Sequence, residues 1–378
     1  MKAGMYFVDG GTACAEGAIS AGCRFFAGYP ITPATSIVEW MAQRLPEVKG
    51  YYLQMEDEIA SIAAIIGASW AGGKAMTATS GPGFSLMQEN LGYAYLTETP
   101  IVVVDAQRSG PSTGQATMPG QQDIMQARYG SHGDIAPIAF VPWSVQEMFD
   151  FTIQAFNYAE RFRSPALVMS DGEVSYMREP LRIPKLEEIP IVNRERLTPK
   201  HSNPDEIFLR YEMPQFGDGM NLLVTGSAHR PTGIRDYTPR FHRATIEWLF
   251  EKNRQAGIAL QKEGLDLEIK HLSSASTVVL SFGAAARPAY HAVQRARKKG
   301  QDVGFIRLKT LWPLPEAHLL ELLKGVHRVF VVEMNMGMMV HEIARIACHA
   351  KVISVPKVAG EVHQSNEILN QLREVNAA

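Results

Sequence analysis

Residues 51–70 read YYLQMEDEIASIAAIIGASW, a short extended segment that runs into a helix. Three acids, Glu56, Asp57 and Glu58, stand in the first turn of this helix, and the next charged residue along the chain is Lys74. Isoleucines recur after the acids at helical spacing, with small residues between them. The pattern therefore predicts a helix that is almost completely buried.

The three acids allow two interpretations. Acidic side chains in the first turn of a helix complement the positive end of its dipole, which requires no function. An acid at the mouth of an apolar, tightly packed helix is poorly hydrated, however, and would seek a protonated nitrogen or a cation as its partner. One of the three is therefore a candidate functional residue.

The composition is ordinary for a globular protein and excludes several classes of partner. The 378 residues are 46% hydrophobic and 20% charged, with a formal net charge of −2, and they are enough for two domains. No long block of one charge occurs, so we expect neither a nucleic acid nor a membrane surface as partner. The chain also has no apolar signal core and no run that could span a bilayer, which predicts a cytoplasmic protein. Its cysteines, Cys14, Cys23 and Cys348, are too few and too scattered for a disulfide framework or a thiolate-bound metal, so we expect no metal site in this chain.

The order of predicted strands and helices divides the chain into three parts. Residues 1–185 alternate strands and helices, which predicts a parallel sheet covered on both faces. Residues 186–262 are rich in prolines, charges and turn signals and contain a long polar helix, so we expect a connector that wraps the first domain. The alternation returns in residues 263–378 and predicts a second, smaller parallel sheet. The fold class is therefore predicted to be α/β, with two doubly wound parallel-sheet domains.

Residues 29–33, YPITP, form a loop that two prolines stiffen. Each proline fixes its own φ and restricts the residue before it, so Tyr29 and Thr32 are biased to extended geometry. The Thr32 hydroxyl would then point in a definite direction. Thr32 could equally be the N-cap of a helix predicted at 34–44, because Pro33 suits the first position of such a helix.

Two further strand ends carry candidate residues. Residues 80–83, SGPG, form a turn between a strand and a helix, where a ligand can approach the backbone, although the turn matches no nucleotide-binding fingerprint. Residues 101–105, IVVVD, predict a strand buried on both faces. Arg108 follows this strand, at the edge of the sheet where α/β proteins keep their chemistry. It could hold a carboxylate bidentately or pair with a nearby acid for structure.

Four motifs together resemble the α subunit of 2-oxoacid:ferredoxin oxidoreductases. They are YPITP at 29–33, QMEDEIA at 54–60, TSGPGFSLM at 79–87 and VDAQRSGPSTG at 104–114. LWPLP at 311–315 and EMNMG at 333–337 are similar to the second domain of that family. The resemblance implies a pyrimidine-binding thiamine domain followed by a transketolase C-terminal-like domain. Met338 departs from the family pattern, in which glutamine commonly follows EMNMG.

The resemblance also implies a reaction. QMEDE and GPSTG resemble the 2-oxoglutarate branch of the family more than the pyruvate branch. The expected reaction converts 2-oxoglutarate, coenzyme A and oxidised ferredoxin reversibly to succinyl-CoA, CO₂ and reduced ferredoxin. The alternatives are the same chemistry on pyruvate or branched-chain 2-oxoacids, a thiamine-dependent transketolase or decarboxylase half, and a non-catalytic scaffold.

The implied cofactor is thiamine diphosphate, shared with a β subunit. In the family that subunit brings the diphosphate and Mg²⁺ site and an iron–sulfur cluster. Residues 217–219, GDG, lack the preceding apolar strand and the following asparagine of a diphosphate motif, so they predict only a loop. We therefore expect an (αβ)₂ assembly, with or without separate γ and δ subunits, and no activity from this chain alone.

Roles in the site follow from the same resemblance. Glu58 is the expected cofactor-activating glutamate, which holds a proton against the pyrimidine ring nitrogen. Tyr29, Pro30 and Ile31 are the other expected cofactor contacts.

The substrate contacts are implied in the same way. Thr32 and Arg108 resemble the residues that hold the carboxylate and carbonyl of the 2-oxoacid and orient them for decarboxylation. For the distal carboxylate of a five-carbon substrate, Arg128, His132 and Lys74 are unranked candidates.

Overall fold

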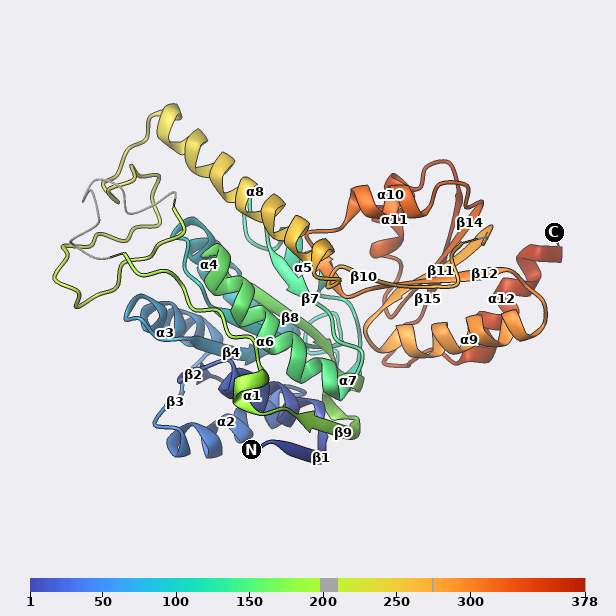
Figure 1. Ribbon diagram of the computed structural model, residues 1–378, viewed down its shortest axis with the longest axis horizontal. Coiled ribbons are helices and arrows are strands. Elements are labelled where there is room, and N and C mark those ends of the chain that lie inside the picture. Colours follow the sequence, from blue (N-terminus) through green and yellow to red (C-terminus); the bar gives the residue numbers. More distant parts are fainter. Residues whose placement is uncertain (198–209, 274, 378) are drawn as a thin grey trace.

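Two β-sheets, each covered by helices, lie side by side in the computed structural model (Figure 1). The structure describes residues 1–197, 210–273 and 275–377. The larger sheet has the order β13-β7-β8-β5-β4-β2-β3, and β6 pairs with β5. Its strands are β2 (Phe25–Gly28), β3 (Tyr51–Gln54), β4 (Ala75–Thr79), β5 (Val102–Ser109), β6 (Gln115–Pro119), β7 (Ile138–Phe140), β8 (Ala166–Asp171) and β13 (Thr310–Trp312). All neighbours pair in parallel except β6 with β5 and β13 with β7.

Helices cover both faces of this sheet. One face carries α1 (Gly10–Ser20), α2 (Thr35–Glu47) and α6 (Val145–Phe162), and the other carries α3 (Glu58–Trp70), α4 (Gly81–Leu96) and α5 (Ile124–Tyr129). Strand β5 shows why its sequence is an unbroken apolar run: Val102 and Val104 join one apolar core, and Val103 joins the other. Side chains alternate along a strand, so a strand buried on both faces needs apolar residues throughout.

The smaller sheet has the order β10-β12-β11-β14-β15, and only β10 is antiparallel to its neighbour. Its strands are β10 (Leu267–Lys270), β11 (Thr277–Phe282), β12 (Val303–Leu308), β14 (Arg328–Glu333) and β15 (Lys351–Pro356). One face carries α9 (Ala286–Lys298) and α12 (Ser365–Ala377), and the other carries α10 (Glu316–Leu322) and α11 (Met339–Ile346). The predicted α/β class with two doubly wound parallel-sheet domains is confirmed.

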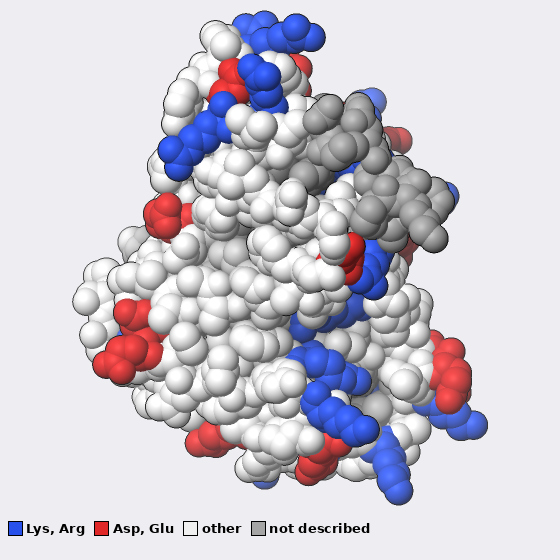
Figure 2. Space-filling view, turned by 90° about the vertical axis from the view of Figure 1, so that its left-hand side faces the viewer, with Lys and Arg blue, Asp and Glu red and all other residues white. Residues whose placement is uncertain are grey.

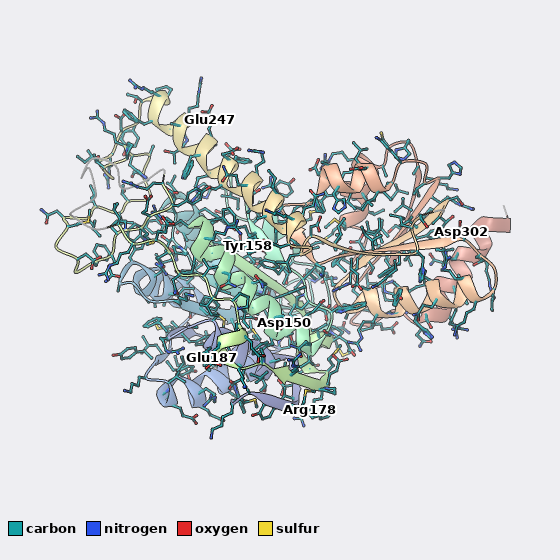
Figure 3. The ribbon with its side chains drawn as sticks, viewed as in Figure 1. Asp150, Tyr158, Arg178, Glu187, Glu247 and Asp302 are labelled. Carbon is teal, nitrogen blue, oxygen red and sulfur yellow. The ribbon has the colours of Figure 1, made fainter. Side chains whose placement is uncertain are left out.

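The remaining elements connect or flank the sheets. They are the antiparallel pair β1 (Gly4–Asp9) and β9 (Arg178–Ile183), the short helices α7 (Gly172–Tyr176), η1 (Leu186–Glu188) and η2 (Gly283–Ala285), and the long helix α8 (Pro239–Lys262). Helix α8 runs past the first sheet and leads into the second (Figure 1). Figure 3 labels Tyr158 on α6 near this helix, and its hydroxyl donates to Glu263 Oε2 at 2.9 Å.

Strand β13 adds a feature that the sequence did not suggest. It belongs to the predicted part 263–378, yet it pairs with β7 at the edge of the first sheet. The division into 1–185, 186–262 and 263–378 stays a prediction, and residues 198–209 of the connector lie outside the described residues.

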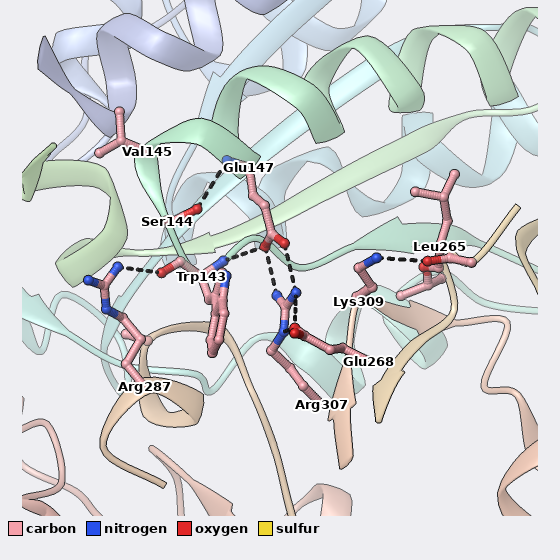
Figure 4. Close-up of polar contacts among 12 residues, drawn as sticks. Trp143, Ser144, Val145, Glu147, Leu265, Glu268, Arg287, Arg307 and Lys309 are labelled. Atoms are coloured by element: carbon pink, nitrogen blue, oxygen red, sulfur yellow. Dashed lines mark hydrogen bonds and ion pairs between the residues drawn. The ribbon is translucent and has the colours of Figure 1, made fainter. Parts of the chain in front are cut away.

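A buried arginine fixes the two sheets to each other (Figure 4). Arg307 of β12 is 1% exposed and donates from both terminal nitrogens to Glu147 of α6, each at 2.7 Å. Its Nε donates to Glu268 Oε2 at 2.8 Å, and the guanidinium lies 4.0 Å from the ring centre of Trp143. The second domain is therefore joined to the first through a paired charge.

Two local predictions were wrong. Helix α2 starts at Thr35 after Ala34, so Thr32 is not its N-cap, and no side chain caps this end. Helix α3 is not almost completely buried: Ile59 is 46% exposed, and Ala63 and Gly67 are exposed on the same side. Four-residue spacing places these three on one helix face, which no other part of the described chain covers.

Within the described ranges, no helix combines the length and the apolarity that a bilayer crossing requires.

Candidate active site

The three acids that open α3 have different environments. Glu56 is exposed, and Asp57 caps the helix by accepting a hydrogen bond from the Ala60 N–H at 2.7 Å. Glu58 is 5% exposed. Asp57 thus fulfils the structural interpretation of the acids, which leaves Glu58 as the buried acid at the edge of the sheet.

Helix α4 leaves room for the Glu58 carboxylate because residue 83 is a glycine. A Cβ at Gly83 would stand 2.3 Å from Glu58 Oε1 and 2.2 Å from Thr79 Oγ1, closer than atoms can approach. Thr79 Oγ1 is buried and has no hydrogen-bond partner in the described part of the chain. Burial raises the pKa of Glu58, the charge of Asp57 adds to this effect, and the charge of Arg108 opposes it.

Arg108 and Thr32 lie together at the neighbouring strand ends. Arg108 Nη1 donates to the backbone carbonyl of Thr32 at 2.9 Å, so the loop after β2 is tied to the end of β5. The arginine is 6% exposed, and its Nε is buried without a partner among the described residues. No acid lies within ion-pair distance of Arg108 in the described ranges, which disfavours the interpretation as a structural ion pair.

The other loop residues stand at the rim of this site. Tyr29 is 41% exposed and Pro30 is exposed, whereas Ile31 is half-buried and packs against the core of the first domain. The loop therefore presents an apolar surface beside Arg108 and Glu58.

A cavity of about 380 Å³ opens next to Arg108. It lies between the start of α4, the loop after β5 and the start of α5, and Met338 contributes from the second domain. The cavity is thus bounded by both domains, and the position that departs from the family pattern is part of its wall.

The unranked candidates for the distal carboxylate are differently placed. Lys74 lies at the amino end of β4, opposite to the site, where its Nζ donates to Ala21 O at 2.9 Å and Val192 O at 2.6 Å. A larger cavity of about 870 Å³ lies there as well, away from Glu58. Arg128 on α5 donates to Ile135 O at 2.6 Å, and His132 is exposed. Lys74 therefore lies at the end of the sheet opposite to Glu58 and Arg108.

Sequence reasoning missed the residue that links this site to the second domain. The backbone N–H of Gln121 donates to Met334 O, and Gln121 Oε1 accepts from the backbone N–H of Met334, each at 3.0 Å. The backbone carbonyl of Gln121 accepts from Asn335 Nδ2 at 2.7 Å. Its Nε2 donates to Phe282 O at 3.0 Å and to Asp171 Oδ2 at 3.1 Å. Only the position of Gln121 after a glycine-rich loop could have drawn attention to it.

The EMNMG tract has a structural role in this arrangement. Glu333 accepts hydrogen bonds from the backbone of Met339 at 2.8 Å and Val340 at 3.0 Å, at the start of α11. Asn335 Oδ1 accepts from Gly337 N at 2.8 Å. The tract thus shapes the loop that places Met338 at the cavity.

Two family models match the chain. "Pyruvate flavodoxin/ferredoxin oxidoreductase, thiamine diP-bdg" covers residues 16–247, and "Pyruvate:ferredoxin oxidoreductase core domain II" covers residues 275–368. The 2-oxoglutarate synthase subunit KorA of Methanocaldococcus jannaschii is 52% identical over 96% of this chain and 97% of its own length. The ketoisovalerate oxidoreductase subunit VorB of Methanothermobacter thermautotrophicus is 33% identical over 97% of each chain.

A solved structure matches as well. The 2-oxoglutarate:ferredoxin oxidoreductase of Magnetococcus marinus, with 2-oxoglutarate, coenzyme A and succinyl-CoA bound, superposes with a TM-score of 0.91 at 33% identity. The match covers 98% of this chain but 65% of that one, so this chain spans about two thirds of the solved chain. The expected resemblance is confirmed, and the chain belongs to the 2-oxoacid:ferredoxin oxidoreductase family.

Proposed function

We propose that this chain is the α subunit of a 2-oxoglutarate:ferredoxin oxidoreductase. The complex would convert 2-oxoglutarate, coenzyme A and oxidised ferredoxin to succinyl-CoA, CO₂ and reduced ferredoxin. The observation that carries the proposal is the placement of a buried glutamate, Glu58, at the same sheet edge as the linked pair Arg108 and Thr32. The higher identity to 2-oxoglutarate synthase subunits than to ketoisovalerate oxidoreductase supports the choice of substrate.

The residues at this edge fit thiamine diphosphate. Glu58 has a raised pKa, so it could hold or share a proton with a ring nitrogen, and the buried Thr79 hydroxyl lacks a partner in the described chain. When bound, the cofactor supplies a carbon nucleophile for the substrate carbonyl and accepts the electrons released with CO₂. Tyr29, Pro30 and Ile31 would form the apolar rim around it.

Arg108 and Thr32 would bind and orient the 2-oxoacid. Arg108 is held through Nη1, and Nη2 has no partner among the described residues, so it remains available to a carboxylate. Decarboxylation requires the carboxylate in a defined orientation, and a buried, tethered arginine provides one. Thr32 would contribute its hydroxyl from the adjacent loop.

A second chain would complete the site. The exposed face of α3, formed by Ile59, Ala63 and Gly67, begins directly beside Glu58 and carries no charge. A Cβ at Gly67 would meet nothing within 4 Å in this chain, so the helix is open to close approach. Figure 2 shows the side of the molecule that carries β3 and α3, where a broad area without charged side chains lies next to a group of basic side chains. Such a face suits a protein partner.

We assign that partner as a β subunit with the diphosphate and Mg²⁺ site and an iron–sulfur cluster. The one GDG sequence of this chain supports the assignment, because residues 217–219 lie in a turn and Asp218 is ion-paired with Arg196. An (αβ)₂ assembly, separate γ or δ subunits and a cytoplasmic location stay predictions.

The test is reduction of ferredoxin or a viologen by the co-purified complex with coenzyme A and 2-oxoglutarate, pyruvate or branched-chain 2-oxoacids. We expect the highest kcat/KM with 2-oxoglutarate. Glu58→Gln should reduce kcat by roughly 2–4 orders of magnitude, the usual contribution of a proton-transfer group. The matched control, Glu56→Gln, changes an exposed acid two residues away. A preference for pyruvate would contradict 2-oxoglutarate as the proposed substrate. Full activity of Glu58→Gln would contradict the proposed role of Glu58.

A further inference from the structure

Two acids that the proposed reaction does not use lie beside Arg108. Asp105 of β5 is completely buried, and strand alternation places its side chain on the same face as Gln107, towards α4 and α5. Gln107 Oε1 accepts a hydrogen bond from the backbone N–H of Asp123 at 3.1 Å, which brings the start of α5 onto this face. Asp123 is therefore held opposite Asp105.

The two carboxyl groups are within hydrogen-bonding reach of each other. Both oxygens of Asp105 and Oδ2 of Asp123 are buried and receive no hydrogen bond from elsewhere in the described ranges. Ionised carboxylates only accept hydrogen bonds, so two of them can bond to each other only if one carries a proton. Burial raises the pKa of Asp105, and the charge of Asp123 raises it further, while burial raises the pKa of Asp123 to about 6. Adjacent buried carboxyls of this kind share one proton between them.

Arg108 faces this pair. A Cβ built on Gly81 would stand 3.9 Å from Arg108 Nε and also 3.9 Å from Asp123 Oδ2, so both atoms border the same small space at the start of α4. The Gly81 N–H approaches both carboxyls and favours their ionised form, as does the charge of Arg108. The charge of Arg108 therefore opposes the rise in pKa at both acids.

We propose that Asp105 and Asp123 form a positioning pair that carries one proton and one negative charge and holds Arg108 in the orientation that binds the 2-oxoacid carboxylate. The inference rests on the proposed role of Arg108. Thr32 O holds the guanidinium through Nη1. The negative charge of the pair lies across the small space beside Gly81 and acts on the guanidinium from beyond ion-pair distance. With one proton the pair balances the arginine charge. Loss of that proton leaves two negative charges beside a site for an anionic substrate, which weakens binding.

Mutation can limit the charge that the pair carries. Asp123→Asn replaces a carboxyl by an amide that cannot ionise, so the pair can carry at most one negative charge, on Asp105, even at alkaline pH. Asp105→Asn likewise limits the pair to one negative charge, which Asp123 then carries. This variant replaces the first one in the experiment if Asp123→Asn fails to assemble. The double variant carries no charge. Asp150→Asn is the control, because Asp150 is also an acid whose pKa burial raises to about 6, but it lies on α6 on the other face of the sheet.

The first measurement is KM and kcat of the assembled complex for the 2-oxoacid from mildly acidic to alkaline pH. In the wild type and in Asp150→Asn, KM should rise once the shared proton leaves. Asp123→Asn should keep the low KM and lose this rise. The double variant should show a KM raised by about tenfold or more at every pH, the scale of a lost charge-assisted interaction. Identical pH profiles for the wild type and Asp123→Asn would overturn the proposal.

The second measurement does not depend on activity. Infrared difference spectra between the wild-type complex and Asp105→Asn at neutral pH should show the loss of one protonated carboxyl band, because the pKa of the remaining Asp123 is about 6. Asp150→Asn should keep this band. Absence of that band from the difference spectrum would overturn the proposal. A complex that prefers another 2-oxoacid would contradict the proposed substrate and leave this spectrum unchanged, so the two failures are distinguishable.

Discussion

Arg108 Nη1 donates to the backbone carbonyl of Thr32 at 2.9 Å, which ties the proline-braced loop after β2 to the end of β5. The two residues are 76 positions apart, and the sheet order places β4 between their strands. The two proposed substrate-binding residues are therefore positioned by a contact across the sheet edge and not by the loop alone.

Arg108→Lys tests this contact. Lysine keeps the charge but cannot reach Thr32 O and a carboxylate in the same planar geometry. We expect kcat/KM for the 2-oxoacid to fall by about 10–100-fold, the range of a hydrogen bond to a charged group. Steady-state kinetics of the complex measure this change in kcat/KM. Arg254→Lys is the control, because Arg254 is an exposed residue on α8. Unchanged kcat/KM would show that Arg108 does not touch the substrate.

Gly83→Ala tests the space that α4 leaves for Glu58. The added methyl would stand 2.3 Å from Glu58 Oε1, so the carboxylate must move. Because catalytic groups tolerate little displacement, we expect kcat to fall at least about 100-fold. Gly257→Ala on α8 is the matched control, since its Cβ would approach only Pro313, at 3.3 Å or more. Equal activities of the two variants would mean that the position of Glu58 is not critical.

Ala63→Arg tests the exposed face of α3. A charged side chain there is solvated in the single chain but would be buried unpaired against a partner. We expect the variant to fold normally and to lose co-purification with the β subunit. Gln294→Arg, on the exposed side of α9, should retain it. Retention of the β subunit by Ala63→Arg would place the interface elsewhere.

Arg307→Met tests the link between the domains. It leaves the carboxylates of Glu147 and Glu268 without their buried partner, and breaking such a pair costs about 3–5 kcal/mol. Chemical unfolding of the complex should show a destabilisation of this size. Arg287→Met removes the more exposed ion pair with Glu179, with the arginine side chain 42% exposed, and should cost below about 1 kcal/mol. Equal costs would contradict the assigned role of Arg307.

The sequence predicted the parts of the site that local chemistry determines. A buried β-branched strand, a glycine turn and a proline-braced loop each indicate a strand end, and in a parallel sheet these ends share one edge. Glu58 was a candidate because it is an acid at the start of an apolar helix. The structure then separated it from Asp57, whose side chain caps the same helix.

The missed residues depend on contacts between distant segments. Gln121 bonds to Met334, 213 positions away, and β13 leaves its own domain to pair with β7. Asp105 follows an apolar run, and an acid at that place in a sequence indicates only the end of a strand. Asp123 lies 18 positions further along the chain, and it is the fold that places it near Asp105. Ile59 is exposed in this chain because it lies on the open face of α3, and helical periodicity does not distinguish a core face from such a face.

The central claim is that Glu58 belongs to a thiamine site completed by a second polypeptide. A crystal or cryo-electron microscopy structure of the co-purified complex with thiamine diphosphate bound tests it most directly. The account predicts the Glu58 carboxylate within hydrogen-bonding distance of a nitrogen of the pyrimidine ring, with the α3 face covered by the β subunit. A pyrimidine ring bound elsewhere, with Glu58 facing solvent, would contradict it.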